Sequence, residues 1–443
     1  MHLTFHRTIF WVHLISGLIA GIVIMSMSVT GLLIAYETQL MEWVNRDLRV
    51  TPPAANAVHL DVETLLAKVR ETKPGFNPSG ITWKGDPEAP MTLSLGREGA
   101  FFINPYTGEV LGEGNHTWHD FFHAATDWHR FLSGTGLSRD VGKMLTGAGT
   151  LVFGILLVSG IYLWWPKHWR WSNLRAVTLF NRKLKGRARD WNWHNVIGFW
   201  SAFPMLFIIL TGLIMSYSWA NNLLYRATGN EPPPPRTRTM GTFGGAPQGG
   251  MAQSGSRPEG GPRGEGGERR SEGGTRGEGG ERRSEGAPRR EGERPAGAPG
   301  MGMRGERPAG PPPSLTGLAP LLAQARAQVA DWTSMSLRMP LKPGDPFPLM
   351  VDRGGRGQVH LRTMFNLDVA QQKVIESPDN LSNQNLGRRL RMYSRYLHTG
   401  ELFGFWGQTV AALCTLAGAM LVWTGFALAW RRFFKRKNKT SAA

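Results

Sequence analysis

Hydrophobic residues are concentrated in four long runs, and polar residues dominate between them. The runs cover about residues 10–36, 143–165, 195–219 and 403–430. Each holds roughly 20 or more mostly apolar residues, the length that an α-helix needs to cross the ~30 Å hydrocarbon layer of a membrane. The first run is longer than the apolar region of a signal peptide and lacks a small-x-small cleavage site, so we expect it to be retained. The pattern therefore predicts four transmembrane helices.

The polar segments after the first and third runs contain shorter periodic elements. In each segment a short amphipathic helix ("VETLLAKVRE"; "LAPLLAQARAQV") precedes a strand, a turn and a second strand ("FFINPYTGEVLGE"; "TMFNLDVAQQKVIES"). The expected fold is an all-α four-helix transmembrane bundle with two small α+β modules outside it. A module of about 55–65 residues is marginally stable alone, so docking of one module on the other is expected to stabilise both.

The chain is an internal duplication. The stretch "HLISGLIAGIVIMSMSVTGLLIAY" (13–36) aligns without gaps with "HNVIGFWSAFPMLFIILTGLIMSY" (194–217), and both share the frame H-x3-G-x12-T-G-L-x3-Y. The second and fourth runs also match, through "WHRFLSGTG…LVSGIYLWWPK" and "LHTGELFG…VWTGFALAWRR". Each half crosses the membrane an even number of times, so the halves are predicted to be parallel repeats about an axis along the membrane normal.

The net charge of +18 is distributed in a way that orients the helices. Residues 166–193 contain eight Lys or Arg and one Asp, and "RRFFKRKNK" follows the fourth run. Short basic loops stay in the cytoplasm. We therefore expect a multi-pass membrane protein with both termini in the cytoplasm and the two modules on the outer, periplasmic side.

A low-complexity insertion interrupts the second module. It is rich in Gly, Arg, Glu and Pro and contains "RGEGGERRSEG" twice. With almost no aliphatic residues it is predicted to be disordered, and the interleaved Glu residues argue against nucleic-acid binding. The predicted organisation is helix 1 (1–36), module 1 with a helix before the second span (37–142), helix 2 (143–165), a basic loop (166–193), helix 3 (194–219), module 2 (220–402) with the disordered insertion (231–313), helix 4 (403–430) and a basic tail (431–443).

Four histidines recur at matched depths in the duplicated halves. His13 and His194 lie near the cytoplasmic start of an outward-going helix, and His129 and His398 precede an inward-going helix at the periplasmic face. An ionisable residue within a membrane span is costly and is a functional candidate. Two imidazoles from different helices suit a six-coordinate haem iron. The sequence therefore predicts two haems per chain, one near each membrane surface.

Small and basic residues accompany these histidines. Because Gly31 follows His13 by 18 residues, or ~27 Å along a helix, it is expected at the depth of the periplasmic histidines. A haem face against a helix needs such missing side chains, and donors to its propionates are also needed. The glycine candidates are Gly31, Gly212, Gly160 and Gly425. The arginine candidates are Arg130 and Arg395 at the periplasmic pair and Arg7 and Arg189 at the cytoplasmic pair.

Other readings of these residues stay open. Helix-end histidines also act as caps, Thr-Gly steps also serve tight helix packing, and interfacial arginines also snorkel toward the headgroups. His123 is an alternative ligand to His129, and His6 is an alternative to His13. The stretch "HTWHDFFH" puts His116, His119 and His123 at helical spacing, which would also suit Zn or Cu. Cys414 is the only cysteine, which excludes disulfides within the chain and Cys-ligated iron–sulfur clusters.

Several motifs resemble those of a known membrane-protein family. "TDWHRFLSGTG", "SGIYLWWPK", "RDWNWHNVIGFW" and "YLHTGELFGFWGQT" are similar to those of the PepSY-associated transmembrane helix family, often called iron-regulated membrane proteins. The resemblance covers nearly the whole chain outside the insertion. It implies PepSY-like modules, a location in the bacterial inner membrane, and ligation of two b-type haems by His13, His129, His194 and His398. It also implies the activity of a ferric-siderophore reductase, which passes electrons to a periplasmic ferric siderophore or other ferric chelate.

The chain carries no nucleotide-binding fingerprint, so the electron donor is expected to be a separate molecule. The sequence does not distinguish between quinol and a separate cytoplasmic flavoprotein. The expected partners are thus the chelate, the donor and membrane lipid, without nucleic acid. One alternative function is a metal or siderophore transporter, although the four runs contain no acidic residue to form a cation pathway. Another is a non-catalytic envelope protein that binds a partner through its modules.

Overall fold

The computed structural model describes residues 2–54, 57–95, 99–166, 168–233, 314–329 and 331–434. The predicted insertion at 231–313 lies almost entirely outside these residues, as does most of the basic tail. Four helices are long and apolar enough to cross a membrane, with spans at Phe5–Ile34, Arg139–Trp164, Gly186–Ser216 and Glu401–Phe433. The coarse prediction of membrane helices together with a β-containing part is confirmed.

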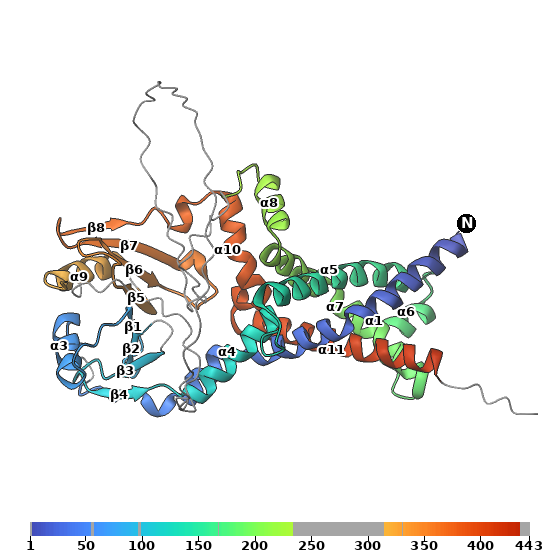
Figure 1. Cartoon of the computed structure of the whole chain (residues 1–443), viewed down its shortest axis with the longest axis horizontal. Helices are drawn as coiled ribbons and strands as arrows, with labels where there is room; N and C mark the ends of the chain where they lie inside the picture. The colour runs from blue at the N-terminus through green and yellow to red at the C-terminus, as the bar shows by residue number, and fades with distance from the viewer. Residues whose placement is uncertain are drawn as a thin grey trace, which may run out of the picture. The chain divides into compact units, whose positions relative to one another are not determined.

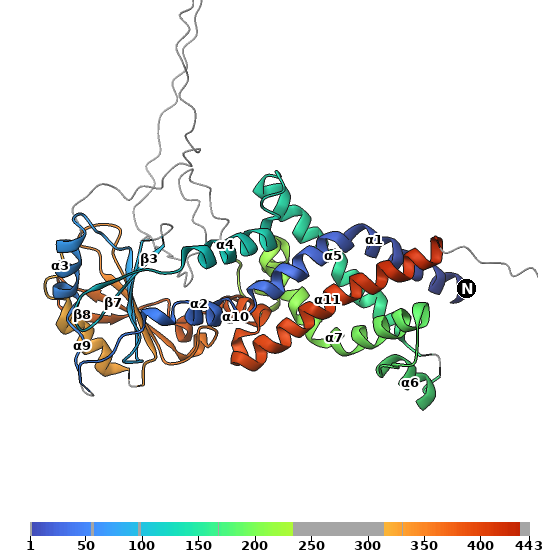
Figure 2. The same ribbon diagram turned by 90° about the horizontal axis from the view of Figure 1, so that it is seen from below.

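The helical bundle consists of four long helices and several short ones (Figure 2). Helices α1 and α7 each pack between α5 and α11, while α4 packs on α1 and α5 and its repeat counterpart α10 packs on α7 and α11. Ile22 and Phe203 are 74% and 72% exposed, as lipid-facing side chains of membrane helices are. The helices of this part are α1 (His2–Ile34), α2 (Glu37–Val44), α4 (His116–Phe131), α5 (Arg139–Trp164), α6 (Trp171–Thr178), α7 (Gly186–Ser216), α8 (Ser218–Ala227), α10 (Leu386–Thr399) and α11 (Gly404–Phe433).

Local signals set the ends of these helices. Side chains of Asn115, Ser138 and Asn385 accept a backbone N–H at the first turn of α4, α5 and α10. Such caps satisfy amide groups that have no partner inside the helix. Helix α10 ends at Thr399 and is followed by Gly400, which adopts a left-handed conformation with φ of 76°, as is common at helix C-termini.

The two expected modules form one continuous antiparallel sheet. Its eight strands run in the order β4-β3-β2-β1-β5-β6-β7-β8. Strand β1 of the first half pairs with β5 of the second, in a register that places Thr82 opposite Ser336. The strands are β1 (Gly80–Lys84), β2 (Met91–Ser94), β3 (Ala100–Ile103), β4 (Val110–Glu113), β5 (Ser334–Arg338), β6 (Phe347–Asp352), β7 (Arg362–Asp368) and β8 (Lys373–Glu376).

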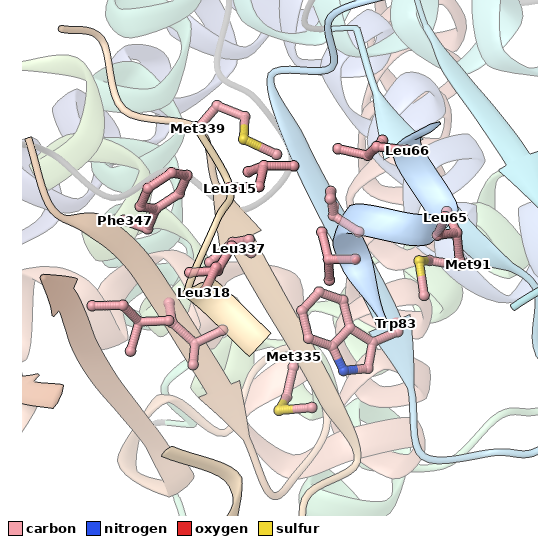
Figure 3. Packing of buried hydrophobic residues seen from close by; sticks show 14 of the residues in the cluster. Leu65, Leu66, Trp83, Met91, Leu315, Leu318, Met335, Leu337, Met339 and Phe347 are labelled. Atoms are coloured by element: carbon pink, nitrogen blue, oxygen red, sulfur yellow. The ribbon is translucent and has the colours of Figure 1, made fainter. Parts of the chain in front are cut away.

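One hydrophobic core serves both halves of this sheet. Helices α3 (Val62–Thr72) and α9 (Leu318–Gln328) lie against it, as Figure 1 shows. Leu65 and Leu318, from these two helices, and Leu337, from β5, are each at most 1% exposed and belong to the same cluster. Figure 3 shows side chains of the two halves facing each other across the β1–β5 joint. The two α+β modules are therefore a single packed unit, because each half would otherwise leave a strand edge and half a core open.

Short 3-10 turns complete the connections, at η1 (Arg46–Leu48), η2 (Val359–Leu361), η3 (Leu381–Asn383) and η4 (Glu401–Phe403). The turn between β6 and β7 reaches the bundle. Arg356 in this turn donates to Thr38 Oγ1 at 2.8 Å and lies 3.6 Å from a Glu401 carboxylate oxygen. Glu401 comes three residues after His398, so the sheet contacts the bundle directly beside a predicted haem ligand.

Candidate functional site: two histidine pairs in the bundle

Two histidines face each other near one end of the bundle. His13 lies in α1, and His194 occupies the matching position in α7. Their ring centroids are 6.4 Å apart and the ring planes cross at 85°. Since both helices pack between α5 and α11, the rings meet in the bundle interior. We call His13 and His194 the α1–α7 pair.

Two further histidines face each other where the short helices dock. His129 lies near the C-terminal end of α4 and His398 near that of α10. Their ring centroids are also 6.4 Å apart, with an angle of 62° between the planes. The asparagine caps of α4 and α10 fix where each helix begins, and hence where its histidine lies. We call His129 and His398 the α4–α10 pair.

Hydroxyl groups fix the tautomer of the α1–α7 pair. His13 Nδ1 lies 2.8 Å from Ser159 Oγ, and His194 Nδ1 lies 2.9 Å from Thr424 Oγ1. Ser159 donates its only hydroxyl hydrogen to the Ile155 carbonyl at 2.7 Å, so its oxygen accepts from His13 Nδ1–H. Thr424 donates in the same way to a carbonyl one turn earlier. Each Nδ1 therefore carries the proton, and each Nε2 keeps a free lone pair.

Backbone carbonyl groups fix the tautomer of the α4–α10 pair. His129 Nδ1 lies 2.9 Å from the Met27 carbonyl oxygen and 3.2 Å from Thr30 Oγ1. His398 repeats this on α7, with the Ile208 carbonyl oxygen at 2.9 Å and a threonine hydroxyl at 3.1 Å. A carbonyl oxygen only accepts, so Nδ1 donates and Nε2 is again free.

Burial keeps the α4–α10 pair neutral. Removal from water lowers the pKa of His129 to about 4, and the nearby His398 lowers it further to a smaller extent. Burial also lowers the pKa of His398. Neutral imidazole is the form that binds a metal ion through its free nitrogen.

A glycine directly follows each of the four hydroxyl residues and admits the histidine ring. In an α-helix each side chain leans over the preceding turn, so glycine at position 31 leaves the Met27 carbonyl open to His129. The serine- or threonine-glycine step is thus a socket for Nδ1. A Cβ built at the glycine would lie 3.2 to 3.8 Å from ring carbon Cε1 in all four facing pairs: Gly31 with His129, Gly212 with His398, Gly160 with His13, and Gly425 with His194.

The spacing within each pair fits a metal ion bound from both sides. Two imidazoles with Nε2–metal bonds of ~2 Å on opposite sides of one ion have ring centroids ~6.3 Å apart. The observed 6.4 Å in both pairs agrees with this value. The second ring nitrogen of a metal-binding histidine donates to a hydroxyl or carbonyl group, as it does here in all four cases. The residues present therefore fit a bis-histidine haem at each pair.

Arginines lie beside the α4–α10 pair. Arg130 directly follows His129. Burial lowers the pKa of the Arg130 guanidinium, the nearby Asp127 carboxylate raises this pKa, and the nearby Arg395 lowers it. Arg395 lies over the ring of Tyr396, 5.8 Å from its centroid. Arg130 and Arg395 are close enough to repel each other, so an anion bound by both would be stabilising. A haem propionate would be such an anion.

The arginines near the α1–α7 pair have other contacts. Arg189 forms an ion pair with Asp190 at 2.9 Å, and Arg431 reaches the other Asp190 carboxylate oxygen at 3.1 Å. Asp190 is only 4% exposed. Because α7 begins at Gly186, this carboxylate lies inside the third long helix, ahead of the apolar run that the sequence defined. Arg7 lies at a groove on the surface of α1.

The alternative histidines lie apart from both pairs. The His6 ring is 6.0 Å from that of Tyr162, and the His119 and His123 rings stack on each other 6.4 Å apart. His116 Nε2 lies 2.6 Å from a Glu113 carboxylate oxygen. Over the residues that the structure describes, no group of three or more His, Cys, Asp or Glu side chains is arranged to hold a metal ion. The zinc or copper alternative is therefore not supported there.

Sequence reasoning placed the four histidines and four glycines but missed the Nδ1 acceptors. In the sequence, Ser159 and Thr424 are only parts of the repeated stretches "LVSGIYLWWPK" and "VWTGFALAWRR", and the glycines indicate only room for haem. The signal was present, because a hydroxyl residue precedes glycine in every copy. The role of all these residues in haem binding stays a prediction.

Comparison with known proteins agrees with this organisation. A family model described as the PepSY-associated TM region matches residues 10–432. The match includes most of α1 and of α11, all of α5 and α7, the described strands and both histidine pairs. A search of curated proteins found no match. Since the family model covers nearly the whole chain, this membrane protein belongs to the PepSY-associated TM region family.

Proposed function

We propose that this protein carries electrons across the bacterial inner membrane through two bound b-type haems and reduces a ferric chelate, such as a ferric siderophore, in the periplasm. The observation that supports this most strongly is the geometry of the two histidine pairs. Both have the centroid spacing of a bis-imidazole metal site, and all four rings have Nδ1 bonded and Nε2 free.

The chain's own groups would hold and tune the cofactor. Bound haem supplies reversible one-electron chemistry of its iron. The four histidines present Nε2, and their Nδ1 acceptors orient each ring and strengthen its basicity. Arg130 and Arg395 offer guanidinium groups to propionates at the α4–α10 pair.

The charge distribution supports one orientation of the two histidine pairs across the membrane. The basic segments 166–193 and 431–443 favour the cytoplasmic side, and the α1–α7 pair lies near the helix ends that join them. Electrons would therefore enter at the α1–α7 pair, from quinol or a separate cytoplasmic flavoprotein. They would leave at the α4–α10 pair, beside the sheet.

The position of the α4–α10 pair supports a periplasmic ferric chelate as the acceptor. The Arg356–Glu401 contact joins the sheet to the turn after His398, so a chelate docked against the sheet would lie near the outer haem. Adding one electron converts Fe(III) to Fe(II). The lower charge weakens binding to carboxylate, catecholate or hydroxamate oxygens, and iron is released. Such a reaction needs no acid–base residue.

A reduced-minus-oxidised absorption spectrum, with haem counted per purified chain, tests the proposal. We expect two haems in the wild-type protein and about one in His398→Ala. Retention of both haems in the double variant His13→Ala/His194→Ala would disprove the ligand assignment. A colourless protein from haem-supplied cells would disprove the proposal and favour transport or partner binding. Single-turnover reduction of a ferric siderophore by dithionite-reduced protein tests the acceptor.

A further inference from the structure

A groove beside the α1–α7 pair combines cationic and apolar walls. It has a volume of about 430 Å³ and lies between α7, the loop before it and α11. Its polar wall includes Arg182 and Arg189. Its apolar wall includes Leu184, Trp193 and Met420. Ile197 extends this wall two helical turns beyond Arg189, or ~12 Å along α7. The groove therefore has the polarity that an amphiphile with an anionic head requires.

The positive charge at the groove is not neutralised within the described chain. Asp190 is occupied by Arg189 and Arg431. No ion pair or side-chain hydrogen bond is formed by Arg182, Lys183 or Lys185 with any residue that the structure describes. An exposed cationic loop above an apolar groove on a membrane helix attracts anionic headgroups, while a neutral ligand gains nothing from those charges.

The groove also has a counterpart in the first half of the chain. In the register that aligns His13 with His194, the α7 wall residues Arg189, Trp193 and Ile197 align with Thr8, Val12 and Ser16. These three residues line a second groove, of about 470 Å³, on α1, together with Arg7. The equivalent faces of α1 and α7 thus each carry a groove, but only the groove on α7 has the additional basic loop beside it.

We propose that the α7 groove is a binding site for an anionic phospholipid. The phosphate would contact Arg182 and the loop lysines, and an acyl chain would lie along Leu184, Ile197 and Met420. Met420 is one helical turn before Thr424, the hydroxyl partner of His194. The bound lipid would therefore pack against the helix turn that orients a predicted haem ligand. The lipid site itself does not depend on haem binding.

Native mass spectrometry of the full-length, detergent-solubilised protein tests this site, with dioleoyl phosphatidylglycerol and dioleoyl phosphatidylcholine as probes. We expect saturable retention of phosphatidylglycerol and much weaker retention of phosphatidylcholine. Arg182→Gln should weaken phosphatidylglycerol binding ~5-fold, the effect of one basic residue near an anionic lipid. Ile197→Trp should abolish it by filling the groove.

Two matched variants separate the groove from general surface charge. Arg175→Gln removes a charge from exposed α6, and Phe203→Trp enlarges a 72% exposed side chain elsewhere on α7. Both should bind phosphatidylglycerol like the wild type. The site is disproved if Arg175→Gln weakens binding as much as Arg182→Gln, if Ile197→Trp leaves binding unchanged, or if phosphatidylcholine binds equally well. Far-UV circular dichroism verifies that each variant keeps its helices.

Discussion

Ser159→Ala is expected to loosen haem at the α1–α7 pair. Ser159 Oγ is the hydrogen-bond acceptor of His13 Nδ1, at 2.8 Å. After the change, the hydroxyl partner is lost and the hydrogen bond with the Leu156 backbone is left to the His13 ring. Loss of such an outer partner typically costs 10- to 100-fold in metal affinity. That range corresponds to ~1.4–2.7 kcal/mol.

The α4–α10 pair provides an internal comparison. Thr30→Val removes a hydroxyl 3.2 Å from His129 Nδ1 but leaves the Met27 carbonyl at 2.9 Å. The remaining acceptor should hold the ring, so the loss of affinity is expected to stay below ~3-fold. Ser159→Thr restores a hydroxyl of the kind found at Thr424, and should retain haem like the wild type.

The assay is the rate of haem transfer from solubilised protein to excess apomyoglobin, followed in the Soret band. Ser159→Ala is measured in a His398→Ala background, in which only the α1–α7 site is expected to bind haem. Thr30→Val is measured in a His194→Ala background. Equal transfer rates with and without Ser159→Ala would refute the role of Ser159 Oγ in holding the His13 ring. A loss in Thr30→Val as large as that in Ser159→Ala would also refute it.

Three further predictions concern ligand identity and stability. His123→Ala should keep two haems per chain, counted by the pyridine haemochrome assay. Loss of one haem would indicate that His123, not His129, is the ligand. Arg362→Ala should destabilise the protein by ~3–5 kcal/mol in thermal unfolding, because it leaves the 5% exposed Asp352 carboxylate without its cation at 2.8 Å. The exposed Arg353→Ala should change stability by less than ~0.5 kcal/mol. Leu337→Ala, at a 1% exposed position, should cost ~2–5 kcal/mol. Amide exchange should then rise in β1 and β5 alike, and a rise confined to the second half would contradict a shared core.

The sequence predicted the membrane helices and the pairing of histidines because both depend on strong local patterns. A run of about twenty mostly apolar residues is typical of a membrane-spanning helix. The duplication indicates which histidines occupy equivalent depths. The strand pairs predicted from "FFINPYTGEVLGE" and "TMFNLDVAQQKVIES" correspond to β3–β4 and β7–β8. The amphipathic helices before them correspond to α3 and α9.

The joint between the two modules could not be predicted in the same way. Strands β1 and β5 have five residues each, too few for a clear alternation. Their pairing joins residues about 250 positions apart, from Ile81 to Leu337, and no local property encodes such a contact. The acceptors of Nδ1 were also hidden, since a carbonyl such as that of Met27 has no sequence signature beyond the glycine four residues later.

The β1–β5 joint also bears on how such a chain can be assembled from separate pieces. Equivalent strands of the two halves meet in antiparallel fashion, with the Thr82 and Ser336 hydroxyls 2.9 Å apart at the centre. Two identical polypeptides related by a two-fold axis can make the same pairing. Each half thus presents a strand edge suited to pairing with its own copy, and here the two edges belong to one polypeptide. Cutting the chain within 166–170 and co-expressing the fragments is expected to restore the protein, whereas the first fragment alone should self-associate through β1.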